Sequence, residues 1–301
     1  MLKPITNAWR KNSAELLGFW NGAIPDFVRA RRPAEFLGGV PVFCYHLVEA
    51  EWFEADLDFL KRNGYHTLRT GQLTDYLNGV SIVPERSVLL AFDDGPRNFH
   101  AVAFPLLQRY QARAVAFIAP GLHADAAADS SMSERPMTWE EMTAIHATGL
   151  VEFQSHTLES RFVPKWPLPA ALSGCDPVLE ASRRKPPLSF AEDLSASQQM
   201  IEARLPGAKV DQLCFPQYLG TREAVGVAES LGFRGCHWGL TAGRPLNRKG
   251  DSPFFISRVT DEYLRRLPGA GRISLRELLQ QRMHRIQSAR AWRQRFEQGH
   301  G

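Results

Sequence analysis

Cysteine is scarce in this sequence, and the few thiols are widely spaced. The chain contains no CxxC pair, and its four cysteines are Cys44, Cys175, Cys214 and Cys236. Their number and spacing exclude the disulfide framework that is typical of small secreted domains. We therefore expect buried, unpaired thiols in a reducing compartment.

The sequence also has no apolar run of the roughly 20 residues needed to span a bilayer. Lys11, Asn12 and Glu15 interrupt the N-terminal segment, and no small-residue cleavage site follows it. We therefore expect no signal peptide. These absences predict a cytoplasmic protein.

What is present is the composition of an ordinary soluble globular protein, with 44% hydrophobic and 23% charged residues in a chain of 301. This composition excludes a collagen-like, low-complexity or wholly disordered chain. A chain of this length can bury a large core, so the fold needs no disulfide or metal merely to hold it together. A single α/β barrel commonly takes about 250 residues, so one domain is compatible with the length.

The net charge of +4 is distributed unevenly along the chain. Residues 1–32 carry +4 and residues 258–301 carry +6, which leaves −6 on residues 33–257. Basic ends favour an anionic partner such as a membrane surface, a phosphorylated ligand or nucleic acid. A basic face exposed to solvent is the simpler explanation, so the charge alone assigns no partner.

Short apolar runs alternate with amphipathic helical segments about seven times. Runs such as 40–45, 87–92 and 150–155 are typical of buried strands. The alternation predicts parallel strands joined by helices, and it favours a barrel over an open sheet. In such a barrel the reactive groups lie where strands end. Six polar residues occupy such positions: His46, Asp93, Asp94, His156, Gln217 and His237.

Asp93, Asp94 and Gly95 form the sharpest motif, directly after the apolar run LLAF. Two adjacent carboxylates can face different partners if Gly95 turns the chain with a positive φ. One carboxylate can then bind a divalent cation while the other takes a proton from bound water. An ordinary Asp-Gly turn is the alternative for this motif alone. His156 and His46 suit a zinc site, although a lone histidine is more often a buried structural residue.

The order of these motifs resembles that of the polysaccharide deacetylase family, the NodB-homology group of carbohydrate esterases. The resemblance covers about residues 40–260, and it implies a distorted (β/α) barrel of seven or eight strands. It is closest to the branch that deacetylates poly-N-acetylglucosamine, which also begins with a Tyr-His motif. The shared motifs are Tyr-His at 45–46, Gly-Tyr at 64–65, FDDG at 92–95, SHT at 155–157 and FP at 215–216.

The resemblance implies a role for each matching residue. Asp93 matches the general base of the family, and His46 matches the general acid of that branch. Asp94 and His156 match two ligands of a catalytic metal. With these roles, the chain would hydrolyse an amide on an amino sugar.

Two further residues take roles from the resemblance. The backbone N–H of Gln217, just after Pro216, matches a group that helps to hold the oxyanion. Arg258 lies where the family often carries an arginine near the catalytic Asp, whose pKa it would lower by direct pairing; a surface arginine is the alternative. Cys214 stands where many members carry an arginine.

The second metal motif departs from the family pattern. The family has another histidine at the fourth or fifth position after the first, where this chain has Ser160 and Arg161. Asp94 and His156 alone would hold zinc weakly compared with a three-ligand site. Three explanations are open: His237 supplies the missing ligand, the enzyme works without a tight metal, or the site is inactive.

Together these observations predict one NodB-type barrel over residues 38–262 with an inserted loop at 161–190. A helical extension at 1–37 and a basic helix at 263–301 would flank it. We expect metal-assisted removal of an acetyl or other acyl group from an N-acylated amino sugar, glycan or glycolipid, with zinc as the metal. The alternatives are a metal-independent C–N amide hydrolase and an inactive glycan-binding relative. We expect no nucleic-acid partner.

The C-terminal helix, predicted over 272–296, combines an apolar stripe with arginines on its other faces. Such a helix suits the surface of an anionic membrane; the alternative is a helix whose stripe is packed on the barrel. If both basic ends lie on one side of the barrel, the protein could sit on the inner membrane face and act on a lipid-linked sugar. The stripe comprises Leu275, Leu279, Met283, Ile286 and Phe296.

Overall fold

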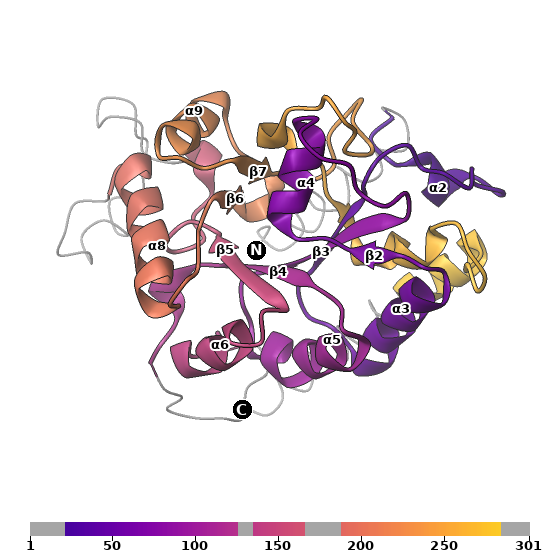
Figure 1. Ribbon diagram of the computed structural model, residues 1–301, viewed down its shortest axis with the longest axis horizontal. Helices are drawn as coiled ribbons and strands as arrows, with labels where there is room; N and C mark the ends of the chain where they lie inside the picture. The colour runs from indigo at the N-terminus through magenta and orange to yellow at the C-terminus, as the bar shows by residue number, and fades with distance from the viewer. Residues whose placement is uncertain (1–21, 126–134, 166–187, 284–301) are drawn as a thin grey trace, which may run out of the picture.

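The computed structural model describes residues 22–125, 135–165 and 188–283. Within these ranges eight strands form one parallel sheet that helices surround (Figure 1). The strands are β1 (Val42–Tyr45), β2 (His66–Thr67), β3 (Ser87–Asp93), β4 (Ala114–Ile118), β5 (Val151–Ser155), β6 (Gln212–Cys214), β7 (Gly235–His237) and β8 (Val259–Thr260).

Helices follow most of the strands, and several begin at a polar cap. The side chains of Thr138, Ser189 and Thr221 each accept a backbone N–H three residues further on, which satisfies donors that helix geometry leaves unpaired. The helices are α2 (Asp26–Arg29), α3 (Ala50–Arg62), α4 (Thr70–Leu77), α5 (Phe104–Tyr110), α6 (Trp139–His146), α8 (Phe190–Arg204) and α9 (Arg222–Ser230). Shorter turns include η1 (Phe99–Ala103) and η7 (Asp261–Arg266).

The sheet curls into a distorted barrel, as the sequence predicts. Its strand order is β7-β6-β5-β4-β3-β1-β8, and β2 pairs with the beginning of β3. One segment connects the two ends of this order. Ile256 forms a parallel bridge with His237 of β7, and Val259 and Thr260 pair with β1. All strands therefore end at the same mouth.

Residues of β3 alternate between the barrel interior and the surrounding helices. Leu89 and Ala91 belong to the interior apolar cluster. Because side chains in a strand alternate between its two faces, Asp93, two residues after Ala91, also points into the barrel, at its mouth. The alternate residues belong to the larger cluster between sheet and helices: Val88, Leu90 and Phe92.

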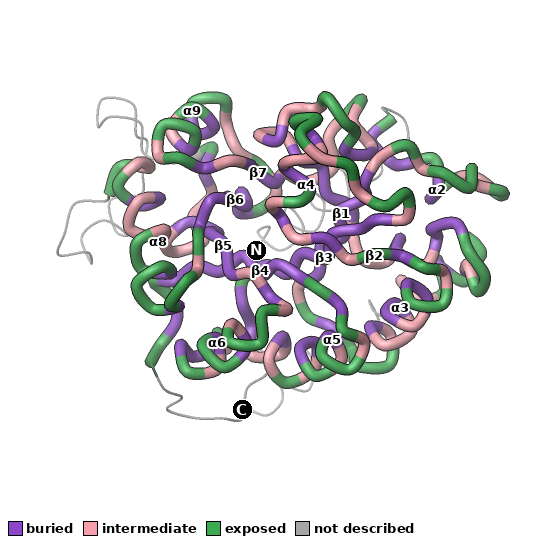
Figure 2. The backbone as a smooth tube through the Cα atoms, in the orientation of Figure 1, coloured by how far each residue is buried: buried purple, intermediate pink, exposed green. Residues whose placement is uncertain are grey.

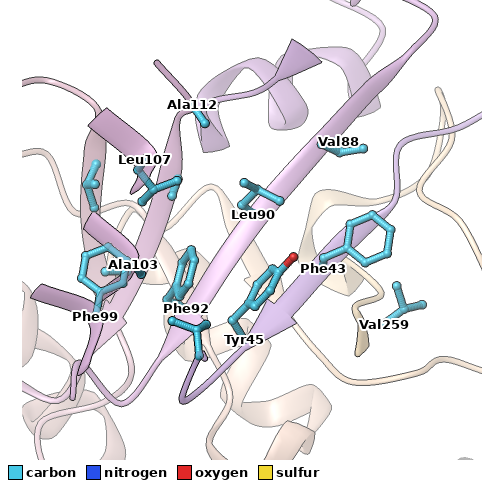
Figure 3. Packing of buried hydrophobic residues seen from close by; sticks show 14 of the residues in the cluster. Phe43, Tyr45, Val88, Leu90, Phe92, Phe99, Ala103, Leu107, Ala112 and Val259 are labelled. Atoms are coloured by element: carbon cyan, nitrogen blue, oxygen red, sulfur yellow. The ribbon is translucent and has the colours of Figure 1, made fainter. Parts of the chain in front are cut away.

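The larger cluster fixes β1 and β3 against the helical segment that follows β3. Phe92 packs against Phe99 there, with ring centroids 4.7 Å apart (Figure 3), and the ring of Tyr45 stacks on Phe92 with centroids 4.9 Å apart. The strands are buried on both faces, whereas the helices expose their outer sides (Figure 2). The mouth is thus built on a rigid frame.

The described parts of the two chain ends lie side by side. Arg266 is buried and donates to the carbonyl oxygens of Val28 and Ala30. Arg272 donates to the carbonyl oxygen of Phe27 at 2.8 Å. A helix then occupies residues 275–283. Most of the extension predicted at 1–37, most of the predicted inserted loop and the C-terminal helix beyond 283 lie outside the described residues. No helix among the described residues is long and apolar enough to cross a membrane.

Candidate active site

Four segments of the chain bring polar side chains together at the mouth of the barrel. Asp93 ends β3, and His46 and His156 directly follow β1 and β5. His46 Nε2 lies 4.0 Å from Asp93 Oδ2, and His156 Nε2 lies 3.4 Å from Asp94 Oδ1. Arg258, which directly precedes β8, donates from Nη1 to Asp93 Oδ1 at 2.7 Å.

Asp93 is only 2% exposed, and both of its oxygens have partners. Besides Arg258, Oδ1 faces the thiol of Cys214 at 3.6 Å, while Oδ2 accepts from the thiol of Cys44 at 3.4 Å. Arg258 is itself buried and donates from Nε to the Trp238 carbonyl oxygen at 2.9 Å. It is therefore an internal partner of Asp93 and not a surface arginine.

The charge of Arg258 decides the protonation state of Asp93. Burial on its own would raise the pKa of this carboxyl, because it penalises the ionised form. Burial is the largest single effect, but the charge of Arg258, the neighbouring His156 and His46 and the hydrogen bond from Arg258 together outweigh it and hold the pKa of Asp93 well below its usual range. Asp93 is therefore an anion at neutral pH and can accept a proton.

Asp94 is far more exposed than Asp93. Its φ of 67° and that of Gly95, 58°, turn the chain sharply after β3, as the Asp-Asp-Gly motif predicts. The Asp94 side chain is 52% exposed and lies beside His156. Its pKa is lowered, chiefly by the hydrogen bond with His156. Ser160 Oγ also donates to Asp94 Oδ1, at 3.4 Å.

The ring of His156 is held in one orientation. Its Nδ1 lies 2.9 Å from the carbonyl oxygen of Cys214. A carbonyl oxygen only accepts, so we assign the ring proton to Nδ1. Nε2 is then the ring nitrogen that faces the Asp94 carboxylate, 3.4 Å from Oδ1.

The loop after β6 completes the mouth. Gln217 and Tyr218 have positive φ values of 55° and 68°, so the loop turns through two consecutive left-handed residues. The backbone N–H of Gln217 makes no hydrogen bond to any described residue and is available to an oxyanion. The Tyr218 hydroxyl lies 3.4 Å from His46 Nε2, and the Arg258 guanidinium lies over the Tyr218 ring, 5.3 Å from its centroid.

His237 is not brought to the predicted metal ligands. It ends β7 as expected, but its side chain is fully buried in the barrel. Its Nε2 lies 3.3 Å from Gln212 Oε1 and its ring packs against Phe117. Burial, aided by the charge of Arg258, lowers the pKa of His237 to about 3. Within the described residues Ser160, and not His237, lies beside Asp94.

Sequence reasoning missed three contributors to this site. Tyr218 contacts His46, and the thiols of Cys44 and Cys214 face the two oxygens of Asp93. The sequence predicts the burial of these thiols, which the structure confirms, but not their neighbour. Cys44 and Ala91 are register partners. Since Cys44 therefore points to the same side as Asp93, strand pairing was the signal that could have found it.

The residues that form the mouth lie largely within a region shared with a known protein family. The family model for polysaccharide deacetylases matches residues 81–236, just over half of the chain. The chain belongs to the polysaccharide deacetylase family.

Individual relatives of this family are similar over limited regions. A stretch of 112 residues, 35% of this chain, is 32% identical to the poly-β-1,6-N-acetyl-D-glucosamine N-deacetylase of Escherichia coli (strain K12). The match spans only 16% of that protein's length.

Solved structures share the fold over most of the chain. IcaB from Ammonifex degensii has a TM-score of 0.62 and 24% identity, and the match covers 78% of this chain and 98% of IcaB. The BpsB deacetylase domain from Bordetella bronchiseptica has a TM-score of 0.58 and 22% identity, covering 76% and 98% respectively. At these identities the likeness concerns the fold alone.

A polysaccharide deacetylase is expected to use a divalent metal, and the donors at the mouth fit one in part. Asp94 and His156 offer a carboxylate oxygen and a ring nitrogen on one side of the turn. The neighbouring donor is the Ser160 hydroxyl, a neutral and weaker ligand than a histidine. The residues present therefore fit a cation held by two strong protein ligands, with other positions open to water or substrate.

Proposed function

We propose that this chain hydrolyses the N-acetyl group of an N-acetylated amino sugar within a glycan or glycolipid. The observation that carries the proposal is the difference in environment between the two adjacent carboxylates at the end of β3. Asp93 is a buried anion paired with Arg258, whereas Asp94 is open to solvent and joined to His156. In this arrangement Asp93 can accept a proton while Asp94 is available to bind a metal ion.

The residues at the mouth can perform both proton transfers that the hydrolysis requires. Asp93 accepts a proton from the attacking water, and His46, 4.0 Å away, donates one to the leaving nitrogen. The N–H of Gln217 binds the oxyanion that develops on the acetyl carbonyl. A divalent cation on Asp94 and His156 supplies Lewis-acid polarisation when bound. The amide C–N bond breaks, and acetate and a free amine are the products.

Acetate release is the direct test of this function. We expect the protein to release acetate from oligomers of β-1,6-linked N-acetylglucosamine, the sugar named for its Escherichia coli relative, and to lose activity on chelation. Adding back zinc, the metal that we propose, or Mn²⁺ should restore the activity.

The other outcomes distinguish the alternatives. Full activity after complete chelation would favour a metal-independent C–N hydrolase. Binding of the oligomer without acetate release, with cation present, would contradict the proposal and favour a glycan-binding relative.

We further propose that the protein binds an anionic membrane peripherally through its C-terminal helix. Leu275, Leu279 and Met283 are 42%, 61% and 56% exposed on one face of residues 275–283. The adjacent face is docked, because Leu278 is buried and Arg282 pairs with Glu262 at 3.3 Å. The net charge of +6 over residues 258–301 complements anionic lipids.

This surface lies near the catalytic mouth. Glu262, the partner of Arg282, follows β8 by two residues in the turn η7, and β8 ends at the mouth beside β1. A membrane at the helix would therefore bring lipid-linked sugars close to the site. The cytoplasmic location expected from the sequence stays a prediction.

Flotation with vesicles that contain phosphatidylglycerol tests the membrane proposal. At low salt the protein should float, because each basic residue near the surface contributes about 1 kcal/mol. Leu279→Ser with Met283→Ser should stay in solution. Val80→Ser with Ile82→Ser is the matched control, since these exposed residues precede β3 at the other end of the barrel. Flotation of the Leu279 and Met283 variant as strongly as the control would contradict the proposal.

A further inference from the structure

Cys44, His46 and Asp93 form a second cluster of metal-binding atoms. Their sulfur, ring nitrogen and carboxylate oxygen all lie within 4.8 Å of one another. Cys44 Sγ is 3.4 Å and His46 Nε2 is 4.0 Å from the same atom, Asp93 Oδ2. None of these residues belongs to the pair formed by Asp94 and His156.

The distances in this cluster approach those of a tetrahedral zinc site. Zinc bonds of roughly 2.3 Å to sulfur and 2.0–2.2 Å to nitrogen and oxygen place neighbouring ligands roughly 3.3–3.6 Å apart. The separation of Cys44 from Asp93 is already in this range. His46 must approach more closely, and its side chain, 36% exposed, lies in the loop after β1, where it can do so.

The two carboxylate oxygens of Asp93 contact different partners. Arg258 holds Oδ1, whereas Oδ2 faces Cys44 and His46. A cation at Oδ2 would therefore leave the ion pair with Arg258 intact. The half-exposed His46 gives such a cation a route from the mouth.

A neighbouring cluster of Asp93, His156 and Cys214 is a poorer candidate. Cys214 Sγ lies 3.6 Å from Oδ1, the oxygen that Arg258 already occupies. A cation there would sit next to the guanidinium charge.

We propose that Cys44, His46 and Asp93 form a second binding position for a thiophilic divalent cation such as Zn²⁺, and that its occupation inhibits the enzyme. Binding exchanges the S–H bond of Cys44 for a bond from sulfur to the metal and releases the proton to solvent. Thiolate ligands select zinc and similar cations over Mg²⁺ or Mn²⁺. A cation at this position would occupy both Asp93 and His46, the proposed base and acid. The claim of inhibition therefore rests on the proposed function, whereas the claim that a cation binds here does not.

Cobalt absorption tests the binding part on the full chain. Co²⁺ in place of Zn²⁺ should produce a near-ultraviolet band from charge transfer between thiolate and metal. Cys44→Ser should abolish the band. Cys214→Ser and Cys236→Ser should keep it, and Cys236 is the matched control because it is also a buried thiol but belongs to neither cluster.

Two outcomes would overturn the proposal: no band in the wild type, or a band that persists in Cys44→Ser, including one that only Cys214→Ser removes. Should Cys44→Ser fail to fold, His46→Ala serves as a second variant. It should weaken Co²⁺ binding by at least about tenfold, since the loss of even an outer partner of a metal ligand has this effect. Unchanged Co²⁺ binding in His46→Ala would likewise overturn it.

Inhibition is measured separately, with each variant compared with its own rate at the optimal cation concentration. Excess Zn²⁺ should inhibit the wild type and Cys236→Ser, while the same excess of Mn²⁺ should not. Cys44→Ser should need at least about tenfold more Zn²⁺ for half-inhibition. Equal Zn²⁺ inhibition of Cys44→Ser would refute the inhibitory role. A chain without any deacetylase activity would contradict the proposed function, and the cobalt result would still decide on the binding position.

Discussion

Asp93 and Asp94 are neighbours in the chain but lie in opposite surroundings. Asp93 belongs to a buried half of the site, which we define as Asp93, Arg258, Cys44 and Cys214. Asp94 belongs to an open half, defined as Asp94, His156 and Ser160, where its own side chain is 52% exposed.

The difference arises from the strand and the turn that ends it. Alternation along β3 points Asp93 into the barrel, and the left-handed residues Asp94 and Gly95 then swing the next carboxylate outward. The buried carboxylate keeps its charge through Arg258, and the exposed one is accessible to a cation. One strand end can therefore supply two carboxylates with different chemical tasks.

The largest effect is expected when the buried carboxylate loses its charge. Asp93→Asn should lower the rate of acetate release roughly 10²- to 10⁴-fold, because it removes a general base. Asparagine keeps an oxygen for the hydrogen bond with Arg258 but leaves that charge uncompensated. We therefore also expect a loss of stability, up to about 3–5 kcal/mol, which the sequence alone does not predict. Initial rates and denaturant unfolding measure both, and a rate within a few-fold of wild type would contradict the assignment.

Removing the positive charge from the buried half should reverse the pH dependence of stability. In the wild type the lowered pKa of Asp93 contributes stability above the usual Asp pKa, and this contribution is lost as the pH falls through the lowered value. In Arg258→Met burial is the dominant effect and raises the pKa. The anion then destabilises the fold as the pH rises through the raised value.

Arg258→Met should therefore cost about 3–5 kcal/mol of unfolding free energy near neutral pH. The cost should shrink towards about pH 4, the usual Asp pKa. Urea unfolding across this range provides the measurement. A cost that does not change with pH would show that Arg258 does not control the ionisation of Asp93.

The open half can be strengthened without touching the buried half. Ser160→His should add an imidazole beside Asp94, where the hydroxyl now lies, and tighten Mn²⁺ binding by at least about tenfold. Calorimetric titration measures the change, and Ser195→His, at a partly exposed position of α8, is a control for an added histidine. If both variants bind Mn²⁺ like the wild type, Ser160 does not occupy a ligand position.

The smallest effect is expected at the contact between Tyr218 and His46. Tyr218→Phe removes one hydrogen bond, typically worth about 0.5–1.5 kcal/mol, so the rate should fall by roughly two- to tenfold. The pH profile of kcat should shift as well, since the hydroxyl contacts His46, the proposed general acid. A lower rate with an unchanged profile would instead indicate a purely structural role.

The fold and most of the site could be predicted from the sequence because both follow from local patterns. Alternating strands and helices gave the barrel, and polar residues at strand ends gave Asp93, Asp94, His46 and His156. His237 shows the limit of this reasoning. It also ends a strand, but its side chain contacts Gln212 and Phe117 in the interior, because a strand-end position does not fix where a side chain points.

The remaining features depend on contacts between distant segments. Tyr218 reaches His46 only because Gln217 and Tyr218 adopt positive φ values that non-glycine residues rarely take. Cys44 and Cys214 meet Asp93 through the pairing and curvature of the sheet, which no local motif encodes. Of these residues, Cys214 also stands where many family members carry an arginine.

Mn²⁺ binding to Asp93→Asn and Asp94→Asn tests the separation of the two halves most directly. Mn²⁺ prefers oxygen ligands to thiolate, so its binding reports on the open half. We predict that Asp94→Asn loses Mn²⁺ affinity by at least about tenfold, that Asp93→Asn binds Mn²⁺ like the wild type, and that neither variant releases acetate at an appreciable rate. Equal loss of Mn²⁺ binding in both variants, or its loss in Asp93→Asn alone, would contradict the account.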